Sequence, residues 1–307
     1  MPLDPLPDPV QYAIPAFVVL IIAEMIYGRL TGRARFEPKD TAASLVMGLG
    51  STIAGAVFAG ATIAIGMVIW EHARLFDIPR TWWAFLIAFV LDDLRYYWFH
   101  RLAHRVRWFW ASHVIHHSSQ HYNLSTALRQ TWTGFFSATW IFKLPLFVIG
   151  FDPLLIAFVA GFNLIYQFWI HTETIRRFPR WFEAVFNTPS HHRVHHATNP
   201  DYLDANYAGT LILWDRLFGT FVAERDDEPC RYGIVKNLRT FNPLVVAFHE
   251  WMGLLHDLVR ARTWRDRWGY VFGPPGWSPD GSRQTSAMLK RSWAAYRARV
   301  TERQAAE

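Results

Sequence analysis

The sequence predicts an all-α, polytopic membrane protein with about five transmembrane helices and a histidine-rich cytoplasmic helical cap. Only 18% of its 307 residues are charged, whereas soluble proteins carry about 25%. The thirty residues Thr41–Trp70 include no charge, and about 20 apolar residues of helix suffice to cross a bilayer. Eleven of the fourteen histidines lie between positions 100 and 196. These observations together predict apolar helices with a histidine-rich layer at one end.

Five apolar segments are candidate membrane spans. They are Ala13–Tyr27, Thr41–Trp70, Trp82–Phe99, Trp132–Gly150 and Pro153–Ile170. We expect the second to be one long, tilted helix rather than a two-helix hairpin. The glycine and proline between the last two segments predict a turn, because both residue types interrupt helices. Buried core helices of a soluble protein are the alternative, and five such segments in one chain make it the minority interpretation.

Basic residues predict the orientation of the spans. Arginines and lysines cluster after the first, third and fifth segments, while the loop between the second and third has only Arg74 and Arg80. Because cytoplasmic loops carry an excess of Lys and Arg, we expect the N-terminus outside and every basic block in the cytoplasm. A two-helix hairpin in the second segment would add one crossing, and the basic blocks would then no longer all lie on the cytoplasmic side. The expected location is a bacterial inner membrane or the endoplasmic reticulum.

The chain divides into three expected regions. Residues 1–84 hold the N-terminal transmembrane helices and residues 85–222 hold the histidine motifs. Residues 223–307 form a cytoplasmic C-terminal region with an amphipathic helix near Val245–Val259 and a polar tail. The net charge of +6 comes from arginines at span ends, where anionic lipid headgroups are the expected partner. We therefore expect membrane and lipid partners and no nucleic acid.

Three histidine motifs predict a site for two metal ions. They are His100-Arg-Leu-Ala-His104, His113-Val-Ile-His116-His117 followed by His121, and His191-His192-Arg-Val-His195-His196. Residues three and four apart lie on one face of a helix, so each motif can aim two or three imidazoles at one point. Imidazole binds iron, zinc and copper. The motifs hold more histidines than one metal ion can bind, which indicates two.

Other assignments of these histidines fit the pattern less well. Two haems would use only four axial histidines and would not require the repeated motif. A metal transporter is expected to place its ligands inside the spans, whereas these lie at and beyond span ends. Incidental surface histidines would not form three spaced motifs on one side of the membrane. A non-enzymatic metal-binding or transport protein stays as an alternative hypothesis.

Polar residues near the motifs are candidate ligands or partners of ligands. His171 stands alone at the end of the fifth segment, where convergence with the motifs favours a ligand. Metal-bound histidines donate their other N–H to a carboxylate or carbonyl, and Asp93 shares a helical face with His100. Further candidates of this kind are Gln167, Glu173 and Asp215. The histidines expected to be structural are His72, His249 and His256.

The motifs resemble the fatty acid hydroxylase/sterol desaturase superfamily of integral-membrane di-iron oxygenases. The run Asn206–Phe221 is similar to the closing motif of that superfamily, and the likeness covers about residues 85–222. Four stretches resemble its ether-lipid-cleaving branch, the alkylglycerol monooxygenases: Tyr122–Gln130, Gln167–Glu173, Tyr232–Ile234 and Gly273–Pro279.

This resemblance implies a set of iron ligands. They are His100, His104, His113, His116, His117, His171, His192, His195 and His196. Gln167 stands beside a position where some members have a further histidine. One metal would then have an open or water-filled position, or a ligand from His121 or His191.

The resemblance also implies a monooxygenase activity. Two iron ions would activate O2 to hydroxylate a C–H bond of a lipid, in the alkylglycerol branch the carbon next to the ether oxygen. A sterol or fatty-acid desaturase or hydroxylase on the same scaffold is the alternative. The single cysteine, Cys230, forms no cluster, and the chain has no Gly-rich nucleotide-binding turn, so an external electron donor is expected. The resemblance suggests tetrahydrobiopterin, with a cytochrome, ferredoxin or reductase as equal alternatives.

Overall fold

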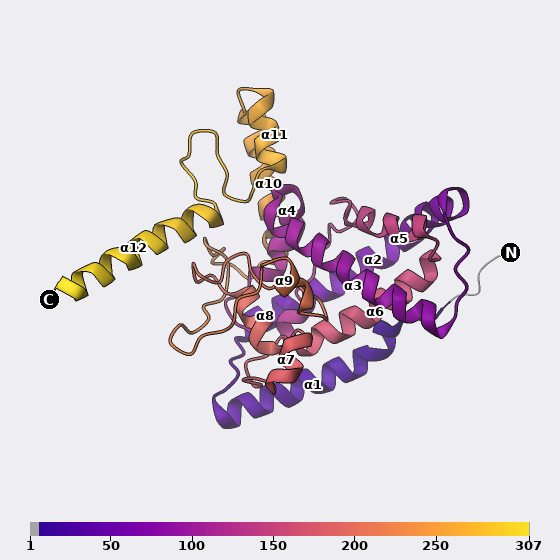
Figure 1. The fold of residues 1–307 in the computed structure, drawn as a ribbon, viewed down its shortest axis with the longest axis horizontal. Coiled ribbons are helices and arrows are strands. Elements are labelled where there is room, and N and C mark those ends of the chain that lie inside the picture. The colour runs from indigo at the N-terminus through magenta and orange to yellow at the C-terminus, as the bar shows by residue number, and fades with distance from the viewer. Residues whose placement is uncertain (1–5, 307) are drawn as a thin grey trace.

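The computed structural model describes residues 6–306 and contains no strand in that range (Figure 1). The long helices are α1 (Pro9–Thr31), α2 (Pro38–Ala73), α3 (Trp82–Arg105), α6 (Pro153–Trp169), α10 (Pro243–Arg260) and α12 (Ser286–Ala306). The shorter ones are α4 (Arg107–His117), α5 (Leu144–Ile149), α7 (Arg180–Val185), α8 (Pro189–His196), α9 (Leu213–Leu217), α11 (Trp264–Phe272) and the 3₁₀ helices η1 (Leu124–Leu128) and η2 (Thr139–Lys143). The predicted all-α class is confirmed.

Helices α1 and α2 are long, apolar and exposed. Each has a proline in its first turn behind an acidic cap, Asp8 for α1 and Glu37 for α2. α2 is one helix of 36 residues, which confirms a single long helix over a hairpin. Only 17% of the most apolar stretch of α1 and 6% of that of α2 are buried inside the protein. Such large exposed apolar faces indicate an apolar environment outside the protein.

Among the helices that the structure describes, α1 and α2 alone are long and apolar enough to cross a bilayer. α3 is long enough but carries Asp92, Asp93 and Arg95 within its apolar stretch, and α6 has 17 residues. The structure therefore offers two candidate membrane spans by length and composition, and the expectation of five transmembrane helices is not confirmed.

The fourth expected span, residues 132–150, is not one helix. Turns occupy its first half, and η2 and α5 form the second. The segment nevertheless follows α2 along its length. Trp132 donates to the carbonyl of Met47 near the start of α2, and Trp70 near its end donates to the carbonyl of Gly150. The distance along the helix between these two contacts is about 35 Å at 1.5 Å per residue, which exceeds the roughly 30 Å thickness of a hydrocarbon core.

The predicted turn before α6 is present. Gly150 has φ 130°, a conformation that favours glycine, and Asp152 caps α6 by accepting the N–H of Leu155. Asp152 also pairs with Arg80 at 2.8 Å. The turn therefore depends on a glycine at position 150 and on the buried carboxylate of Asp152, which joins this turn to the loop that holds Arg80.

The bundle has two distinct ends. Pro9 at the start of α1 lies against Gly161 in the middle of α6, and Phe17 of α1 stacks on Phe168 near the end of α6 at 4.0 Å, so α1 and α6 run in the same direction. The start of α3 packs against the start of α6 through Ala84 and Leu155. The C-terminal ends of α1, α3 and α6 therefore lie together, and we call this the histidine end of the bundle.

The remaining helices gather at the histidine end. Helices α4, α7, α8 and α9 surround it with their connecting loops (Figure 1). Helices α10 and α11 form a hairpin that projects sideways, and α12 extends away from the body. The helices that carry the histidine motifs thus sit where three bundle helices end.

We expect Gly150→Ala to destabilise the protein by at least about 2 kcal/mol. A Cβ there would overlap the carbonyl oxygen of Phe76, and the positive φ adds strain. Gly60→Ala is the control, because Gly60 lies in α2 with open space around it and alanine favours a helix by about 1 kcal/mol. Thermal unfolding in detergent, followed by tryptophan fluorescence, should show a lower Tm for Gly150→Ala alone. An unchanged Tm for that variant would contradict the structural role of the turn.

Candidate metal centre

Nine histidines, eight of them buried, meet at the histidine end in two adjacent groups. The first group is His100, His104, His113, His117 and His195; the second is His116, His171, His192 and His196. Within each group, one ring nitrogen of every residue lies within 4.8 Å of those of the others. The structure thus brings together the same nine histidines to which the sequence points.

Helical spacing divides the histidines between the two groups. α3 supplies two residues one turn apart to the first group. α4 supplies both groups, because the adjacent His116 and His117 are turned about 100° apart around the helix axis. The adjacent His195 and His196 of α8 are divided in the same way. His171 joins the second group from the chain just after α6.

The ring nitrogens face one another at hydrogen-bond distance. Nε2 of His100 lies 2.9 Å from Nε2 of His113. Nε2 of His171 lies 3.1 Å from those of both His116 and His192. A neutral imidazole has only one N–H. A ring that donates from Nδ1 therefore presents a lone pair from Nε2 to its neighbours.

Burial keeps these imidazoles neutral. It lowers the pKa of His116 to about 4 and that of His195 to about 3, because the charged form loses its hydration. Nε2 of His104 and Nε2 of His196 are buried without a hydrogen-bond partner among the described residues. Converging neutral lone pairs and orphaned nitrogens form a donor set for transition-metal ions. The residues therefore fit the two metal ions that the motifs predict.

Backbone carbonyls determine which ring nitrogen faces the centre. The Nδ1–carbonyl pairs are His100 with Tyr207 at 2.8 Å, His171 with Gln167 at 2.7 Å, His195 with Ala205 at 3.0 Å and His116 with Arg129 at 3.3 Å. A carbonyl only accepts, so Nδ1 carries the proton and Nε2 is left to face the centre. Four of the nine histidines are thus oriented by the main chain.

Asp93 does not contact His100, and the expectation of a carboxylate partner for that ligand is corrected. The buried carboxylate of Asp93 accepts hydrogen bonds from Asn163, Thr210, Leu211 and Trp214. It therefore holds the loop that leads to α9. Nδ1 of His100 is hydrogen-bonded instead to the backbone carbonyl of Tyr207, which lies three residues before Thr210.

Asp215 supports this carbonyl from behind. Its carboxylate accepts the N–H groups of Tyr207 and Ala208, both at 2.8 Å, and the hydroxyl of Thr220. Burial raises the pKa of Asp215 to about 6, although all three hydrogen bonds favour the ionised form. Asp215 thus acts on the site through the main chain.

The other candidate residues lie beside the groups but not in them. His191 lies 4.0 Å from Glu183, and His121 lines a separate cavity. The side chain of Gln167 donates to Asn163, while Glu173 accepts the hydroxyl of Tyr232 at 3.2 Å. The histidines expected to be structural, His72, His249 and His256, are also outside both groups.

Sequence reasoning missed the buried ion pair of Arg129 and Asp40. Arg129 is 1% exposed and donates to Asp40 at 2.8 Å and to Ser118 at 3.0 Å. The backbone carbonyl of Arg129 also accepts a hydrogen bond from Nδ1 of His116. The pair therefore ties the first turn of α2 to the loop that orients a ligand. The feature of the sequence that could have revealed this pair is Asp40 itself, an acidic residue directly before an uncharged run of thirty residues.

Comparison with known proteins identifies the domain that carries this geometry. A sequence model of the fatty acid hydroxylase family matches residues 85–220, a stretch that contains all nine histidines. The chain therefore carries a fatty acid hydroxylase domain over these residues.

The proteins similar to this chain include lipid oxygenases. The chain is 40% identical to alkylglycerol monooxygenase of Homo sapiens over 285 residues, which is 92% of this chain and 62% of that protein. The Danio rerio enzyme is 39% identical over 91% of this chain and 62% of its own length. An ornithine lipid hydroxylase of Rhizobium tropici is 25% identical over 59% of this chain and 56% of its own. The chain thus spans less than two thirds of the alkylglycerol monooxygenases it matches, and no solved structure matches it.

Two cavities reach the histidines. An apolar cavity of about 570 Å³ lies between α1, α2, α3 and α6 and touches His113, His116 and His171. A second cavity, of about 840 Å³, lies under the C-terminal region and touches His104, His117, His195 and His196. Charged residues line the second one, among them Asp204, Lys236, Glu250 and Arg283. The centre is thus approached from the bundle and from the cap.

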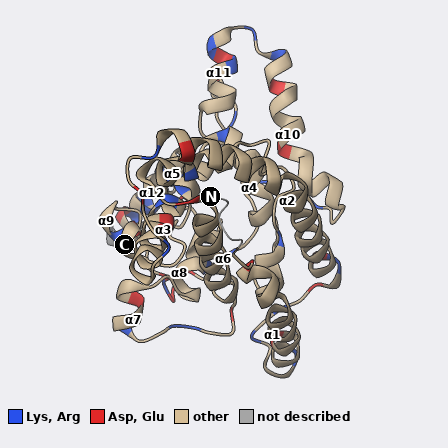
Figure 2. Ribbon diagram, turned by 90° about the vertical axis from the view of Figure 1, so that its right-hand side faces the viewer, with Lys and Arg blue, Asp and Glu red and all other residues tan. Residues whose placement is uncertain are grey.

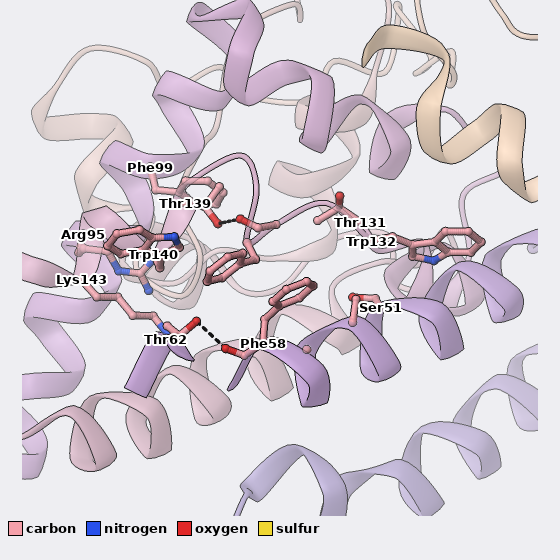
Figure 3. A pocket seen from close by; sticks show the side chains of 14 residues that line it. Ser51, Phe58, Thr62, Arg95, Phe99, Thr131, Trp132, Thr139, Trp140 and Lys143 are labelled. Atoms are coloured by element: carbon pink, nitrogen blue, oxygen red, sulfur yellow. Dashed lines mark hydrogen bonds between the residues drawn. The ribbon is translucent and has the colours of Figure 1, made fainter. Parts of the chain in front are cut away.

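A smaller cavity of about 280 Å³ adjoins the apolar one. Figure 3 shows it between α2 and the irregular segment after η1, with Arg95 and Lys143 at one end. It shares Phe99, Thr131 and Thr139 with the lining of the apolar cavity. The two cavities therefore lie next to one another along α2.

We expect Asp215→Asn to lower both stability and metal content. The amide NH₂ would face one of the two buried N–H groups that the carboxylate now accepts, at a cost of about 1–3 kcal/mol. The carbonyl of Tyr207 would then move from its position against His100. Asp226→Asn is the control, because Asp226 is 61% exposed and far along the chain from the ligands. A variant Asp215→Asn with normal Tm and normal metal content by elemental analysis would refute this role.

Proposed function

We propose that this chain is a membrane-bound di-iron monooxygenase that uses O2 to hydroxylate a C–H bond of a lipid, at the carbon next to the ether oxygen of an alkylglycerol. One observation carries the proposal: an apolar cavity between the bundle helices ends at three histidines of the nine. The family match and the similarity to alkylglycerol monooxygenases support the lipid substrate and the reaction.

Two iron ions are the proposed metals, one in each histidine group. Five neutral imidazoles would hold the first and four the second, with four of the nine rings oriented by carbonyl oxygens. Bound iron would supply the activation of O2 that an unactivated C–H bond requires. The low pKa values of buried His116 and His195 keep these rings neutral at neutral pH, so one nitrogen of each ring is free of a proton and can bind a metal ion.

The apolar cavity is the proposed site of the alkyl chain. Exposed side chains of α1 and α2, among them Ile14, Val18 and Leu49, line its outer part. An alkyl chain that enters between these helices would stay in apolar surroundings on its way to the centre. Hydroxylation beside the ether oxygen gives a hemiacetal, which breaks down to an aldehyde and glycerol.

The proposed reaction requires an external reductant. Hydroxylation places one oxygen atom of O2 in the product and reduces the other to water, which consumes two electrons and two protons. We propose that the charged cavity beside His104 and His195 receives the donor. Its volume of about 840 Å³ suits a small molecule such as tetrahydrobiopterin; a redox protein that docks over the same opening is the alternative.

We infer that the bundle crosses the membrane five times, with the histidine end in the cytoplasm. α1, α2, α3, residues 132–150 and α6 would be the five crossings, the fourth irregular in its first half. Irregular backbone is tolerated within a membrane where other parts of the protein shield it from lipid. The hydrogen bonds that join both ends of this segment to α2 support such shielding. The basic residues that follow α1, α3 and α6 support the orientation.

We expect the purified protein to contain about two iron ions per chain and His195→Ala to lose one of them. Removal of a ligand should reduce activity at least about 100-fold, since even loss of a group that hydrogen-bonds to a metal ligand costs 10–100-fold. His256→Ala is the matched control, because that side chain is 54% exposed and outside both groups. Elemental analysis and lipid turnover are the measurements. An active, iron-free protein would overturn the metal assignment.

Lipid turnover by the purified protein should distinguish the substrate classes. Alkylglycerols, sterols and fatty acids would be supplied in nanodiscs with O2, with and without reduced pterin. We expect aldehyde release from alkylglycerols alone. Hydroxylated or desaturated sterols or fatty acids would favour the alternative enzyme on the same scaffold. Iron-loaded protein without turnover of any lipid would favour a metal-binding or transport protein.

A further inference from the structure

Helices α10 and α11 carry apolar faces that no described part of the protein covers. The exposed residues are Leu244, Phe248, Met252, Leu255 and Val259 of α10 and Trp264, Trp268 and Phe272 of α11. Val259 is 75% exposed and Trp264 is 74% exposed. Their spacing of three and four residues places each set on one side of its helix.

The opposite side of α10 is already packed. Val246 and Ala247 are buried with Met47 of α2 and Val114 of α4. On the flank between the packed and exposed sides, Trp251 donates to the hydroxyl of Thr133 at 2.9 Å. α10 cannot turn its exposed face inward without losing this interface. The exposed face therefore needs a partner from outside the chain.

The hairpin lies across the direction of the bundle, at the histidine end. In Figures 1 and 2, α10 and α11 run side by side across the direction of α1 and project beyond the rest of the protein. α10 packs beside Met47 of α2, and the neighbouring Val46 and Leu49 are exposed. The apolar face of α10 therefore continues the exposed apolar face of α2.

Arginines border this apolar face. Arg260, Arg262 and Arg265 are exposed and make no ion pair or hydrogen bond within the described residues. Arg267 lies over the ring of Trp264, 4.7 Å from its centre. Figure 2 shows basic residues at the turn that joins the two helices. Tryptophan and aliphatic side chains on one face with arginines beside them are typical of helices that lie in a membrane interface.

We propose that α10 and α11 form an in-plane membrane anchor, whose apolar faces lie among the lipid acyl chains and whose arginines contact phosphate headgroups. The occupant is the cytoplasmic leaflet of the bilayer that the bundle spans. The proposal rests on the membrane placement given above and is independent of the metal and the reaction. A second copy of the chain fits less well, because the arginines of two paired hairpins would meet.

This anchor is coupled to the metal centre through Arg107. The buried guanidinium at the start of α4 donates to Glu250 at 2.7 Å and Asp257 at 2.6 Å, both on α10. Its N–H donates to the carbonyl of Gly273 just after α11. α4 carries three of the nine histidines. A hairpin fixed in the membrane interface would therefore determine how deep the three histidines of α4 lie relative to the lipid headgroups.

Nitroxide accessibility in nanodiscs tests the anchor in the full-length protein. Single cysteines would be placed in a Cys230→Ser background by Leu255→Cys and Trp268→Cys on the apolar faces, and by His256→Cys and Asp266→Cys on the polar sides. Val19→Cys on α1 is the lipid control and Thr301→Cys on α12 the water control. Nanodiscs of phosphatidylcholine and phosphatidylglycerol with one copy each exclude pairing of hairpins.

We expect O2, which concentrates in lipid, to relax the spins at 255 and 268 at least threefold more, relative to an aqueous nickel reagent, than those at 256 and 266. Equal, water-like ratios at all four positions with a lipid-like ratio at 19 would overturn the anchor and leave the membrane placement intact. Water-like ratios at 19 as well would overturn the placement itself.

The wild-type protein provides a second measurement that needs no substitution. A lipid-dissolved carbene reagent, activated by light in the same nanodiscs, should label peptides from residues 244–272 as well as those of α1 and α2. Labelling of α1 and α2 without residues 244–272 would overturn the anchor. Loss of labelling at 244–272 only when two copies share a nanodisc would instead assign the face to a second copy.

Discussion

At the histidine end, imidazole nitrogens face one another at distances of 2.9–3.2 Å inside the protein. A protein alone gains little from this arrangement, since neutral rings cannot satisfy every facing lone pair and charged rings would repel one another in a low dielectric. Positive metal ions remove both costs. The requirement to hold nine such rings in place explains why the protein buries so many polar groups around them.

The buried polar groups act mainly on the backbone. Asp93 holds the loop before α9, Asp215 holds the N–H groups behind Tyr207, and the Asp40–Arg129 pair fixes the chain behind His116. The main-chain carbonyls then orient the ligands. A carbonyl has no proton to lose, so it sets the tautomer wherever the ring is neutral, while the carboxylates behind it do not contact the histidines.

The histidine motifs and the apolar runs are local signals, and the sequence therefore predicted the nine clustered residues and the single long helix α2. The irregular segment after η1 was not predictable, because its apolar composition is that of a span while its backbone is set by contacts with α2 such as Trp132 to Met47. The ligand partners were missed for a related reason. Any residue has a carbonyl, so Tyr207, Gln167 and Ala205 leave no mark of this role in the sequence.

The two large cavities meet the histidines on different residues, His113, His116 and His171 for the apolar one and His104, His117, His195 and His196 for the charged one. The histidine layer thus separates an apolar space within the bundle from a polar space under the C-terminal region. A lipid oxidation with a water-soluble reductant needs this separation, because the two reactants partition into different phases. Residues from 233 onward supply most of the lining of the charged cavity, beyond the family match at 85–220, so most of the residues that would choose the reductant lie outside the shared domain.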